Sequence, residues 1–495
     1  MLRQEKDGEQ SSFADHSMAA GSVPNEHLLL RMKAAVDWAA VEKSLADYYD
    51  AYEGRPSWPP AVLVRMLILE QYGDLSDREV SEQTGYNLLY RAFVGLGLEE
   101  RIPDDTTLVR FRSRLGEEGV RRVFELLLER WRQAGLVGNE RRVLDASHLW
   151  AKGARRSWVS LLRQGRALVV EAVAEVDSQR AMGLRERYVA SGGAVEPRGQ
   201  EALQLERGQT RELLEAVADL KAERVVERVR LLEGMLAEGD RPVSFVDADA
   251  RWGRKGPDKA YCGYKTHQAL DPDSRLITAV DVLPGNANEA VRTQVLLSQE
   301  QGQLAEGVTV IGDGLYAKAG TVAQVEALKG RACFSGLWAK RVSDRFDYEA
   351  GADRMVCAAG KASIGKVRVG QGDLYYFSMA DCHSCPQAPK CLSPGEQKGK
   401  APPRRRVYLS DVRKRKVLAG QAGRAWRREQ YRVRYRIEAK FDEQMNRHGL
   451  RRARYWGLAK VTLQVLLNII TVNLKRVVRL LAAGGAPARP ALAGA

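Results

Sequence analysis

The sequence predicts an α/β protein in which a mixed-sheet core carries a long helical insertion and follows an all-α N-terminal domain. Apolar residues recur at helical spacing from Leu28 to about Gly138. Short β-favouring segments then alternate with helical ones from Arg141 to Phe334, and purely helical periodicity fills residues 155–237 between them. With 495 residues and 44% hydrophobic content, the chain is long enough to bury at least one large core.

The first structured region is predicted to be a helical DNA-binding domain over residues 25–138, preceded by a polar, disordered tail at 1–24. Its segment 75–87 has a helix N-cap at Ser76, one helix, a glycine turn and the start of a second helix. A helix-turn-helix DNA reader has this outline, and so does ordinary helical packing. The pattern leaves both interpretations open.

Two aspartates stand where a predicted strand changes abruptly into another pattern. Val308 to Ile311 indicate a buried strand that ends at Asp313, and the flanking glycines would let backbone, metal or phosphate come close to that carboxylate. Asp145 lies at a similar change of pattern in the strand-like segment 141–147. Taken singly, each aspartate is more simply a turn or helix-cap residue.

The order of the remaining elements brings the two aspartates together. Two strands at 261–270 and 276–283, joined by a turn at 271–274, precede a helix at 288–303, a strand at 308–311, a helix at 322–328 and a strand at 332–334. With the Asp145 strand this gives β, β, β, α, β, α, β, the order of an RNase-H-like core over 139–335. The helical insertion 155–237, broken at 191–193, interrupts it and suits packing or dimer contacts. In that fold the first and fourth strands are parallel neighbours, so Asp145 and Asp313, each late in its strand, would be adjacent and would share a metal.

The charge of the chain indicates a polyanionic partner. Lys and Arg outnumber Asp and Glu by 78 to 63, which gives a net charge of +15. The most apolar segment, 461–474, is too short to span a bilayer and suits a buried helix. Without a signal peptide, we expect a cytoplasmic protein associated with the bacterial nucleoid and no membrane partner.

A basic segment leads to a third acidic residue. Residues 404–436 contain thirteen Lys or Arg against Asp411 and Glu429, which favours a phosphate-tracking surface over a merely solvated face. Beyond it, Ile437 and Phe441 lie on one helical face with Glu438 beside it. Helix salt bridges are the simplest role for Glu438, and a metal ligand is the alternative.

These residues together resemble the DDE transposases of bacterial insertion sequences, over about residues 56–480. Asp145 and Asp313 are similar to the first two acidic residues of that family, and Tyr431, Arg434 and Glu438 match the Y-x2-R-x3-E motif of one large branch. Segments 263–267, 284–286 and 449–455 are also similar to that branch.

The resemblance implies a catalytic triad of Asp145, Asp313 and Glu438 that binds Mg²⁺ or Mn²⁺, hard ions that prefer oxygen ligands. The branch usually has a lysine seven residues after the glutamate, where this chain has Met445, and Lys440 or Arg447 would replace it as a DNA contact. The residues expected to contact DNA are Tyr431, Arg434, Lys440, Arg447, Arg451 and Arg452.

The six cysteines indicate a metal site in a reducing compartment. Cys357, Cys382, Cys385 and Cys391 supply four thiolates of the kind that hold a structural zinc ion, and buried free cysteines are the alternative. They belong to a predicted insertion at 336–420, which precedes C-terminal catalytic helices at 421–481 and a disordered tail at 482–495. Cys262 and Cys333 lie in strand patterns and are expected in the core.

The predicted function is that of a transposase that binds the ends of an insertion sequence, cuts them and joins their 3′-hydroxyl ends to target DNA by two-metal phosphoryl transfer. Its partner is double-stranded DNA, and we expect a homodimer in the DNA complex. A transposase-derived DNA-binding protein, or a nuclease without strand transfer, is the alternative. No histidine motif for zinc, P-loop or dinucleotide-binding fingerprint is present.

Overall fold

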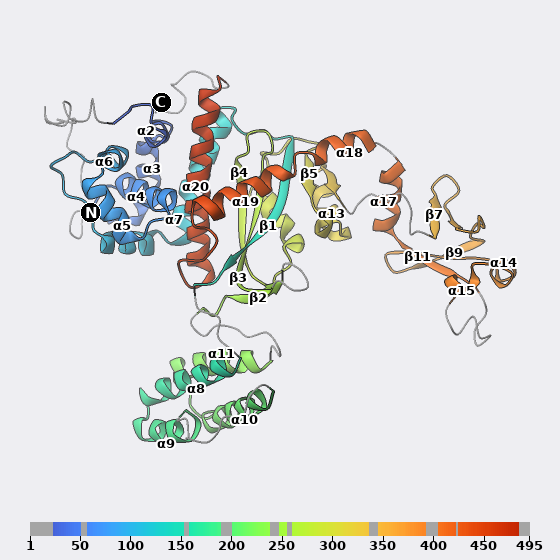
Figure 1. Ribbon diagram of the computed structural model, residues 1–495, viewed down its shortest axis with the longest axis horizontal. Helices are drawn as coiled ribbons and strands as arrows, with labels where there is room; N and C mark the ends of the chain where they lie inside the picture. Colours follow the sequence, from blue (N-terminus) through green and yellow to red (C-terminus); the bar gives the residue numbers. More distant parts are fainter. Residues whose placement is uncertain are drawn as a thin grey trace.

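In the computed structural model, a long C-terminal helix lies between a group of N-terminal helices and a central mixed sheet (Figure 1). A separate helical unit lies beyond one end of the sheet, and a strand-rich arm extends to the side. The structure describes residues 23–50, 57–152, 158–189, 200–237, 247–254, 260–335, 345–392, 404–421 and 424–484. The predicted tails at 1–24 and 482–495 lie almost wholly outside these ranges, as does the predicted break at 191–193.

The N-terminal region is helical, as predicted, and its helices begin at recognisable caps. Ser76 forms a capping box with Glu79, and the Asp104 side chain accepts a hydrogen bond from the Thr107 backbone. Gly85 lies inside a helix instead of forming the predicted turn, because the break falls at Asn87, whose side chain caps the next helix. The helices are α2 (Leu28–Ala34), α3 (Trp38–Ser44), η1 (Ala46–Tyr48), α4 (Pro60–Gly73), α5 (Asp77–Tyr86), α6 (Leu88–Val94) and α7 (Asp105–Gln133).

Helix α20 (Leu458–Ala482) joins these helices to the rest of the chain. Its segment 461–474 is wholly buried, as the apolar run predicted. It packs against α2, α4 and α7 on one side and against strand β4 on the other. One hydrophobic cluster therefore runs from the N-terminal helices through α20 to the sheet. The N-terminal helices complete their core with a helix from the opposite end of the chain.

The central sheet contains β1 (Arg141–Trp150), β2 (Arg251–Arg254), β3 (Ala260–Leu270), β4 (Ile277–Pro284), β5 (Thr309–Gly312) and β6 (Arg331–Phe334). Strands β1 and β4 pair antiparallel with the two edges of β3, and the short β2, absent from the predicted order, pairs with the start of β3. Strand β5 pairs parallel with β1, and β6 pairs parallel with β5. The predicted parallel pairing of the two aspartate-bearing strands is confirmed.

Other details of this region differ from the predictions. Strand β1 continues five residues beyond Asp145, because β3 pairs with it as far as Trp150. The predicted helix at 288–303 is only η2 (Glu289–Arg292) and α12 (Thr293–Ser298). The predicted helix at 322–328 is α13 (Ala319–Ala327).

The helical insertion forms a unit with its own hydrophobic cluster. The buried Arg166 guanidinium donates to the Glu206 carboxylate at 2.6 Å inside this unit. Its helices are α8 (Trp158–Ala174), α9 (Ser178–Tyr188), α10 (Gln200–Ala216) and α11 (Glu223–Ala237).

The arm is rich in short strands that the sequence did not indicate, since glycines and charged residues interrupt their apolar alternation. They are β7 (Phe346–Glu349), β8 (Arg354–Cys357), β9 (Gly365–Val369), β10 (Gly372–Tyr376) and β11 (Arg406–Ser410), with short helices α14 (Met379–His383) and α15 (Ala388–Cys391). The chain returns to the sheet through α17 (Asp411–Gln421), α18 (Arg424–Tyr431) and α19 (Tyr435–Arg447) (Figure 1). None of the helices in the described ranges has the length and apolar character needed to cross a membrane.

Candidate functional site

The two predicted aspartates lie side by side in the sheet. The parallel register pairs Val143 of β1 with Ile311 of β5, so two residues further on Asp145 is level with Asp313. Asp313 stands just past the end of β5, where its carboxylate accepts a hydrogen bond of 2.8 Å from the Leu315 backbone N–H. Asp145 instead lies in mid-strand, and its Oδ1 accepts from the Ala146 N–H at 2.9 Å.

Packing requires a glycine at position 312, directly before the second aspartate. A Cβ atom at this position would lie 2.9 Å from the Tyr316 ring and 3.1 Å from the Phe334 ring. Tyr316 is fully buried behind the two aspartates. The Tyr316 and Phe334 rings therefore leave no room for a side chain at this turn.

Helix α19 brings the third acidic residue to the two aspartates. Ile437 and Phe441 are buried and fix the helix on the sheet, as their spacing predicted. The Arg434 guanidinium donates to Glu438 at 2.6 Å and to Oδ2 of Asp145 at 3.2 Å. Arg434 therefore lies between two of the three carboxylates, and Glu438 remains half-exposed to solvent.

The site is electrostatically unfavourable for three ionised carboxylates. Burial, helped by the nearby Asp313 and Glu438 carboxylates, raises the pKa of Asp145 to about 6 against the opposing effect of Arg434. A cation among these oxygen atoms would relieve that repulsion, which is why the group fits a divalent metal. In the described ranges, no three His, Cys, Asp or Glu side chains are already arranged as metal ligands.

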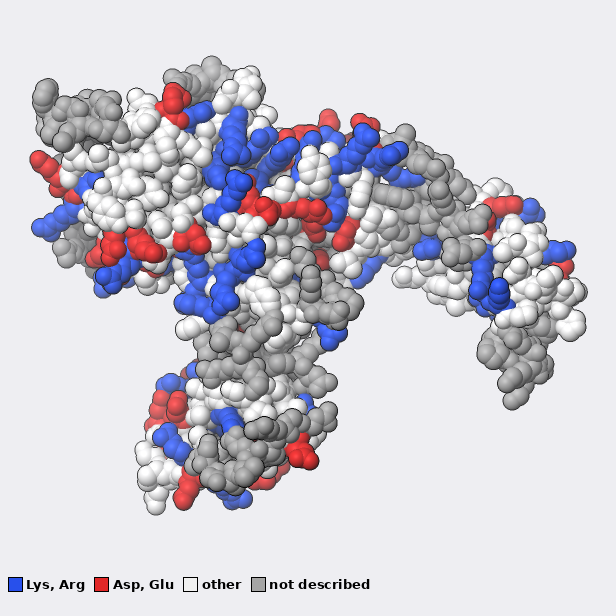
Figure 2. All heavy atoms as spheres, in the orientation of Figure 1, with Lys and Arg blue, Asp and Glu red and all other residues white. Residues whose placement is uncertain are grey.

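The predicted DNA-contacting residues divide into exposed and buried ones. Arg447, Arg451 and Arg452 are exposed, and the Trp150 N–H donates to the Arg451 carbonyl at 3.1 Å, which holds this segment against the end of β1. Tyr431 is half-buried, with the Arg434 guanidinium 6.0 Å from its ring centroid. Figure 2 shows Lys and Arg gathered along α18, α19 and α20.

Lys440 differs from the other residues predicted to contact DNA, because it is buried. It lies on the buried face of α19, where its Nζ donates to Glu443 at 2.9 Å and to the Val472 carbonyl at 3.4 Å. Only 6% of the residue is exposed, and burial lowers the pKa of its ammonium. In this structure Lys440 therefore stabilises the α19–α20 contact instead of extending from the surface. Met445, which stands where the branch has lysine, has its sulfur 3.8 Å from the Ser147 hydroxyl on β1.

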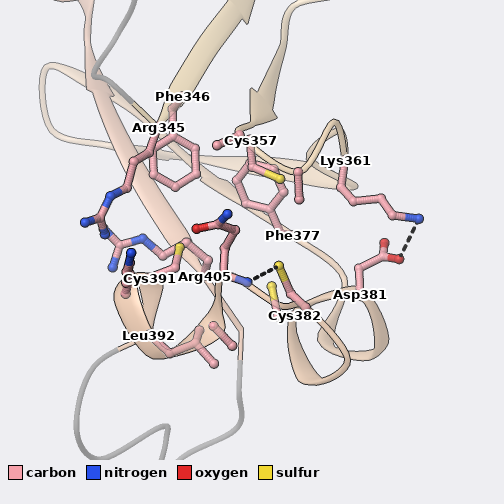
Figure 3. Close-up of a pocket in the computed structure, with 16 residues that line it drawn as sticks. Arg345, Phe346, Cys357, Lys361, Phe377, Asp381, Cys382, Cys391, Leu392 and Arg405 are labelled. Atoms are coloured by element: carbon pink, nitrogen blue, oxygen red, sulfur yellow. Dashed lines mark hydrogen bonds and ion pairs between the residues drawn. The ribbon is translucent and has the colours of Figure 1, made fainter.

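Four of the six cysteines line one pocket in the arm. Figure 3 shows Cys357, Cys382 and Cys391 around it, and Cys385 also lines it, with its sulfur accepting from the Gln387 N–H at 3.4 Å. Burial raises the pKa of Cys391, to which Cys382 and Cys357 also contribute. The thiols are free and lie near each other without forming a ligand cluster among the described residues.

The other two cysteines differ in their burial. Cys333 is fully buried, as predicted, whereas Cys262 is half-buried at the edge of the core.

The sequence did not indicate a buried charge cluster between the N-terminal helices and the segment that follows α19. Glu70 of α4 is almost fully buried and accepts from Arg112 at 3.0 Å and from Arg454 at 2.8 Å. Burial raises the pKa of Glu70, and the two guanidinium groups oppose that effect. Arg454 belongs to the 449–455 segment, and Gly449 has φ +66° with no room for a Cβ atom beside the Asp74 carboxylate. This segment therefore attaches the α19–α20 connection to the N-terminal helices.

Two family models match the chain. A transposase domain (DUF772) matches residues 18–114, which include most of the N-terminal helices. A transposase DDE domain matches residues 356–478, which include the four clustered cysteines, Arg434, Glu438 and most of α20. The second match begins after Asp145 and Asp313, so these two residues enter the site through the sheet geometry alone.

Proposed function

Because the chain belongs to the DDE transposases of insertion sequences, we propose that it binds the ends of such an element, cuts them and joins the freed 3′-hydroxyls to target DNA. We propose an RNase-H-like fold for the central sheet. The support is its order, with β4 and β2 on one edge of β3, then β1, β5 and β6. We further propose that two chains act together, one at each end of the element.

The observation that carries the catalytic proposal is the convergence of three carboxylates from three separate elements. Asp145 comes from mid-strand β1, Asp313 from the end of β5 and Glu438 from α19, and the last two both affect the pKa of Asp145. Sites of this kind favour oxygen-preferring divalent cations such as Mg²⁺ or Mn²⁺. When bound, two such ions would activate the attacking oxygen and stabilise the departing one.

The chain's own residues hold this arrangement. Arg434 donates to Glu438 and Asp145, so it orients two carboxylates and offsets part of their charge. The Leu315 N–H occupies Oδ1 of Asp313, which leaves Oδ2 of that carboxylate for a ligand. In strand transfer, the 3′-hydroxyl oxygen forms a bond to a target phosphorus while the target's own P–O3′ bond breaks.

The experiment uses a pre-nicked duplex that carries an end of the element, with Mn²⁺ and the full chain. Asp145→Asn, Asp313→Asn and Glu438→Gln keep side-chain shape and should each lower strand transfer by about 10²-fold or more. Glu429→Gln is the matched control, since Glu429 is exposed on α18 in the same basic region. DNA binding should survive in all four variants. Near-normal strand transfer by any triad variant would remove that residue from the site.

The same assay separates the alternatives. A nuclease would release the ends without joining them, and a DNA-binding derivative would do neither. The grouping of Asp145, Asp313 and Glu438 favours the enzyme, because three carboxylates together repel the phosphate backbone unless a cation binds among them.

We propose that α5 and α6 recognise the element's ends. Tyr86 at the end of α5 is 68% exposed, and Leu88 at the start of α6 is also exposed. Because α20 completes the core of these helices, the full chain has to be tested rather than the isolated domain. Tyr86→Ala should reduce the preference for end DNA over random duplex at moderate salt. An unchanged preference would contradict a reading role for this helix pair.

We also propose that Cys357, Cys382, Cys385 and Cys391 bind one zinc ion that stabilises the arm. The support is their shared pocket and the preference of zinc for four thiolates in structural sites. Metal analysis should find about one zinc per chain, and less in a Cys382→Ser, Cys385→Ser double variant. Cys262→Ser is the control, and unchanged zinc in the double variant would refute the site.

A further inference from the structure

Four arginines from three elements meet at the turn between β3 and β4. The Arg436 guanidinium of α19 donates to the Pro272 carbonyl at 2.5 Å, and Nε of Arg476 of α20 donates to the Ser274 carbonyl at 2.6 Å. Arg275 belongs to the turn itself and is exposed, and Arg479 lies one helical turn beyond Arg476. The like charges of Arg275, Arg479 and Arg436 act with burial to lower the pKa of Arg476.

The turn is held rigidly in this position. Its first residue, Asp271, accepts from the Gly138 N–H at 2.9 Å and from the Ser274 hydroxyl at 2.5 Å. Arg275 adopts a left-handed φ of +61°, which a non-glycine residue keeps only when its surroundings enforce it. The backbone thus fixes the point from which the Arg275 side chain extends.

The acidic groups nearby do not neutralise the four arginines. Asp273 lies 3.6 Å from Arg436, but it also pairs with Arg141 at 2.5 Å. Glu443 acts on Arg476 while it pairs closely with Lys475 at 2.8 Å. In the described part of the chain, the exposed guanidinium groups of Arg275 and Arg479 have neither a hydrogen bond nor an ion pair.

We propose that Arg275, Arg436, Arg476 and Arg479 form a phosphate-binding site for the backbone of duplex DNA beside the cleavage point. Helix α19 carries both Arg436 and Glu438, two residues apart, so the two side chains extend from different sides of one helix. Figure 2 shows basic side chains over the upper part of α20 and along α19, with acidic ones grouped below them. Guanidinium groups suit such a site because they bind phosphate oxygens in pairs. The inference rests on the proposed function only in taking DNA as the ligand.

The test is a salt titration of the full chain on a random-sequence duplex of about 30 base pairs, long enough to cover several phosphates of each strand. Arg275→Ala with Arg479→Ala removes two phosphate-binding groups and should weaken binding roughly tenfold at moderate salt. The slope of log affinity against log salt should fall by about 0.9 for each phosphate that is no longer neutralised. The matched control is Arg211→Ala with Arg230→Ala, which removes two exposed arginines from the separate helical unit and should change neither quantity.

A charge-preserving variant and the cleavage assay complete the design. Arg275→Lys with Arg479→Lys should recover most of the salt slope. A double alanine variant that matches the control in affinity and slope would overturn the proposal, as would a lysine variant no better than alanine. Glu438→Gln tests the catalytic proposal independently. If the double alanine variant has a reduced salt slope but Glu438→Gln stays active, only the catalytic proposal is refuted. If the salt slope is unchanged but Glu438→Gln is inactive, only the phosphate-binding site is refuted.

Discussion

Replacing Asp145 by asparagine should stabilise the fold in the absence of metal while abolishing catalysis. The pKa of Asp145 is about 6, whereas an unfolded aspartate has a pKa near 3.9. The ionised carboxylate is therefore less favourable in the folded protein than in the unfolded chain. Its unfavourable effect is absent below about pH 4, grows as pH rises through 6, and is complete above that pH.

The size of the effect follows from the same shift. Two pKa units at about 1.4 kcal/mol each give an upper limit of about 3 kcal/mol for the penalty of ionised Asp145 at pH 8. Asparagine keeps the shape of the side chain, but it has one oxygen where Ala146 N–H and Arg434 bond to two different oxygens of Asp145. The lost hydrogen bond lowers the stability of the variant by about 1 kcal/mol. The net gain in unfolding free energy should be about 1 to 2 kcal/mol, which corresponds to a few degrees in melting temperature.

Thermal unfolding at pH 8 and at pH 5, with chelator or with Mn²⁺, measures this difference. In chelator the variant should melt higher at pH 8, and the gap should narrow at pH 5. Saturating Mn²⁺ should stabilise the wild type by about 2.7 kcal/mol at a hundred times its dissociation constant and leave the variant almost unchanged. Asp442→Asn on the exposed face of α19 is the control. A variant that melts lower than wild type at pH 8 in chelator would refute the reasoning.

Three further outcomes follow from buried charges. Arg112→Met should lower stability by about 1.5 to 3 kcal/mol, because the buried Glu70 carboxylate then keeps Arg454 as its guanidinium partner but loses Arg112. The exposed Arg110→Met should change stability by under about 0.5 kcal/mol, and equal melting curves of the two variants would contradict this. The exposed Arg447, when replaced by alanine, should reduce the salt slope of DNA binding by about 1. The buried Lys440, when replaced by alanine, should lower the melting temperature and leave the salt slope unchanged. The reverse result would show that Lys440 contacts DNA. Burial lowers the pKa of His267 to about 3, so the wild type should lose stability as the pH falls below about 6.5, the pKa of an unfolded histidine. In thermal unfolding at pH 7 and pH 5, His267→Leu should show a smaller loss of stability than the wild type.

Much of the site was predictable from local pattern. Residues close together in the sequence determine three of these features: the strand before Asp313, the helix cap at Ser76 and the buried face of α19. The order of strands and helices also sufficed to predict the parallel pairing of β1 and β5. Rules on how strands are connected leave few sheet topologies for such an order. The family resemblance then assigned roles to Asp145, Asp313 and Glu438, and those roles stay predictions.

Contacts between distant parts of the chain were decided only by the tertiary structure. Lys440 is two residues from Glu438, yet its helix face is covered by α20, and the sequence of α19 does not contain that information. The length of β1 depends on β3, more than a hundred residues later. Glu70 becomes a buried anion because Arg112 and Arg454 reach it from two other elements. Sequence periodicity indicated the main helices and the longer strands of the central sheet, because it depends on neighbouring residues. Which charged side chains are buried and which stay exposed was determined by packing between distant elements.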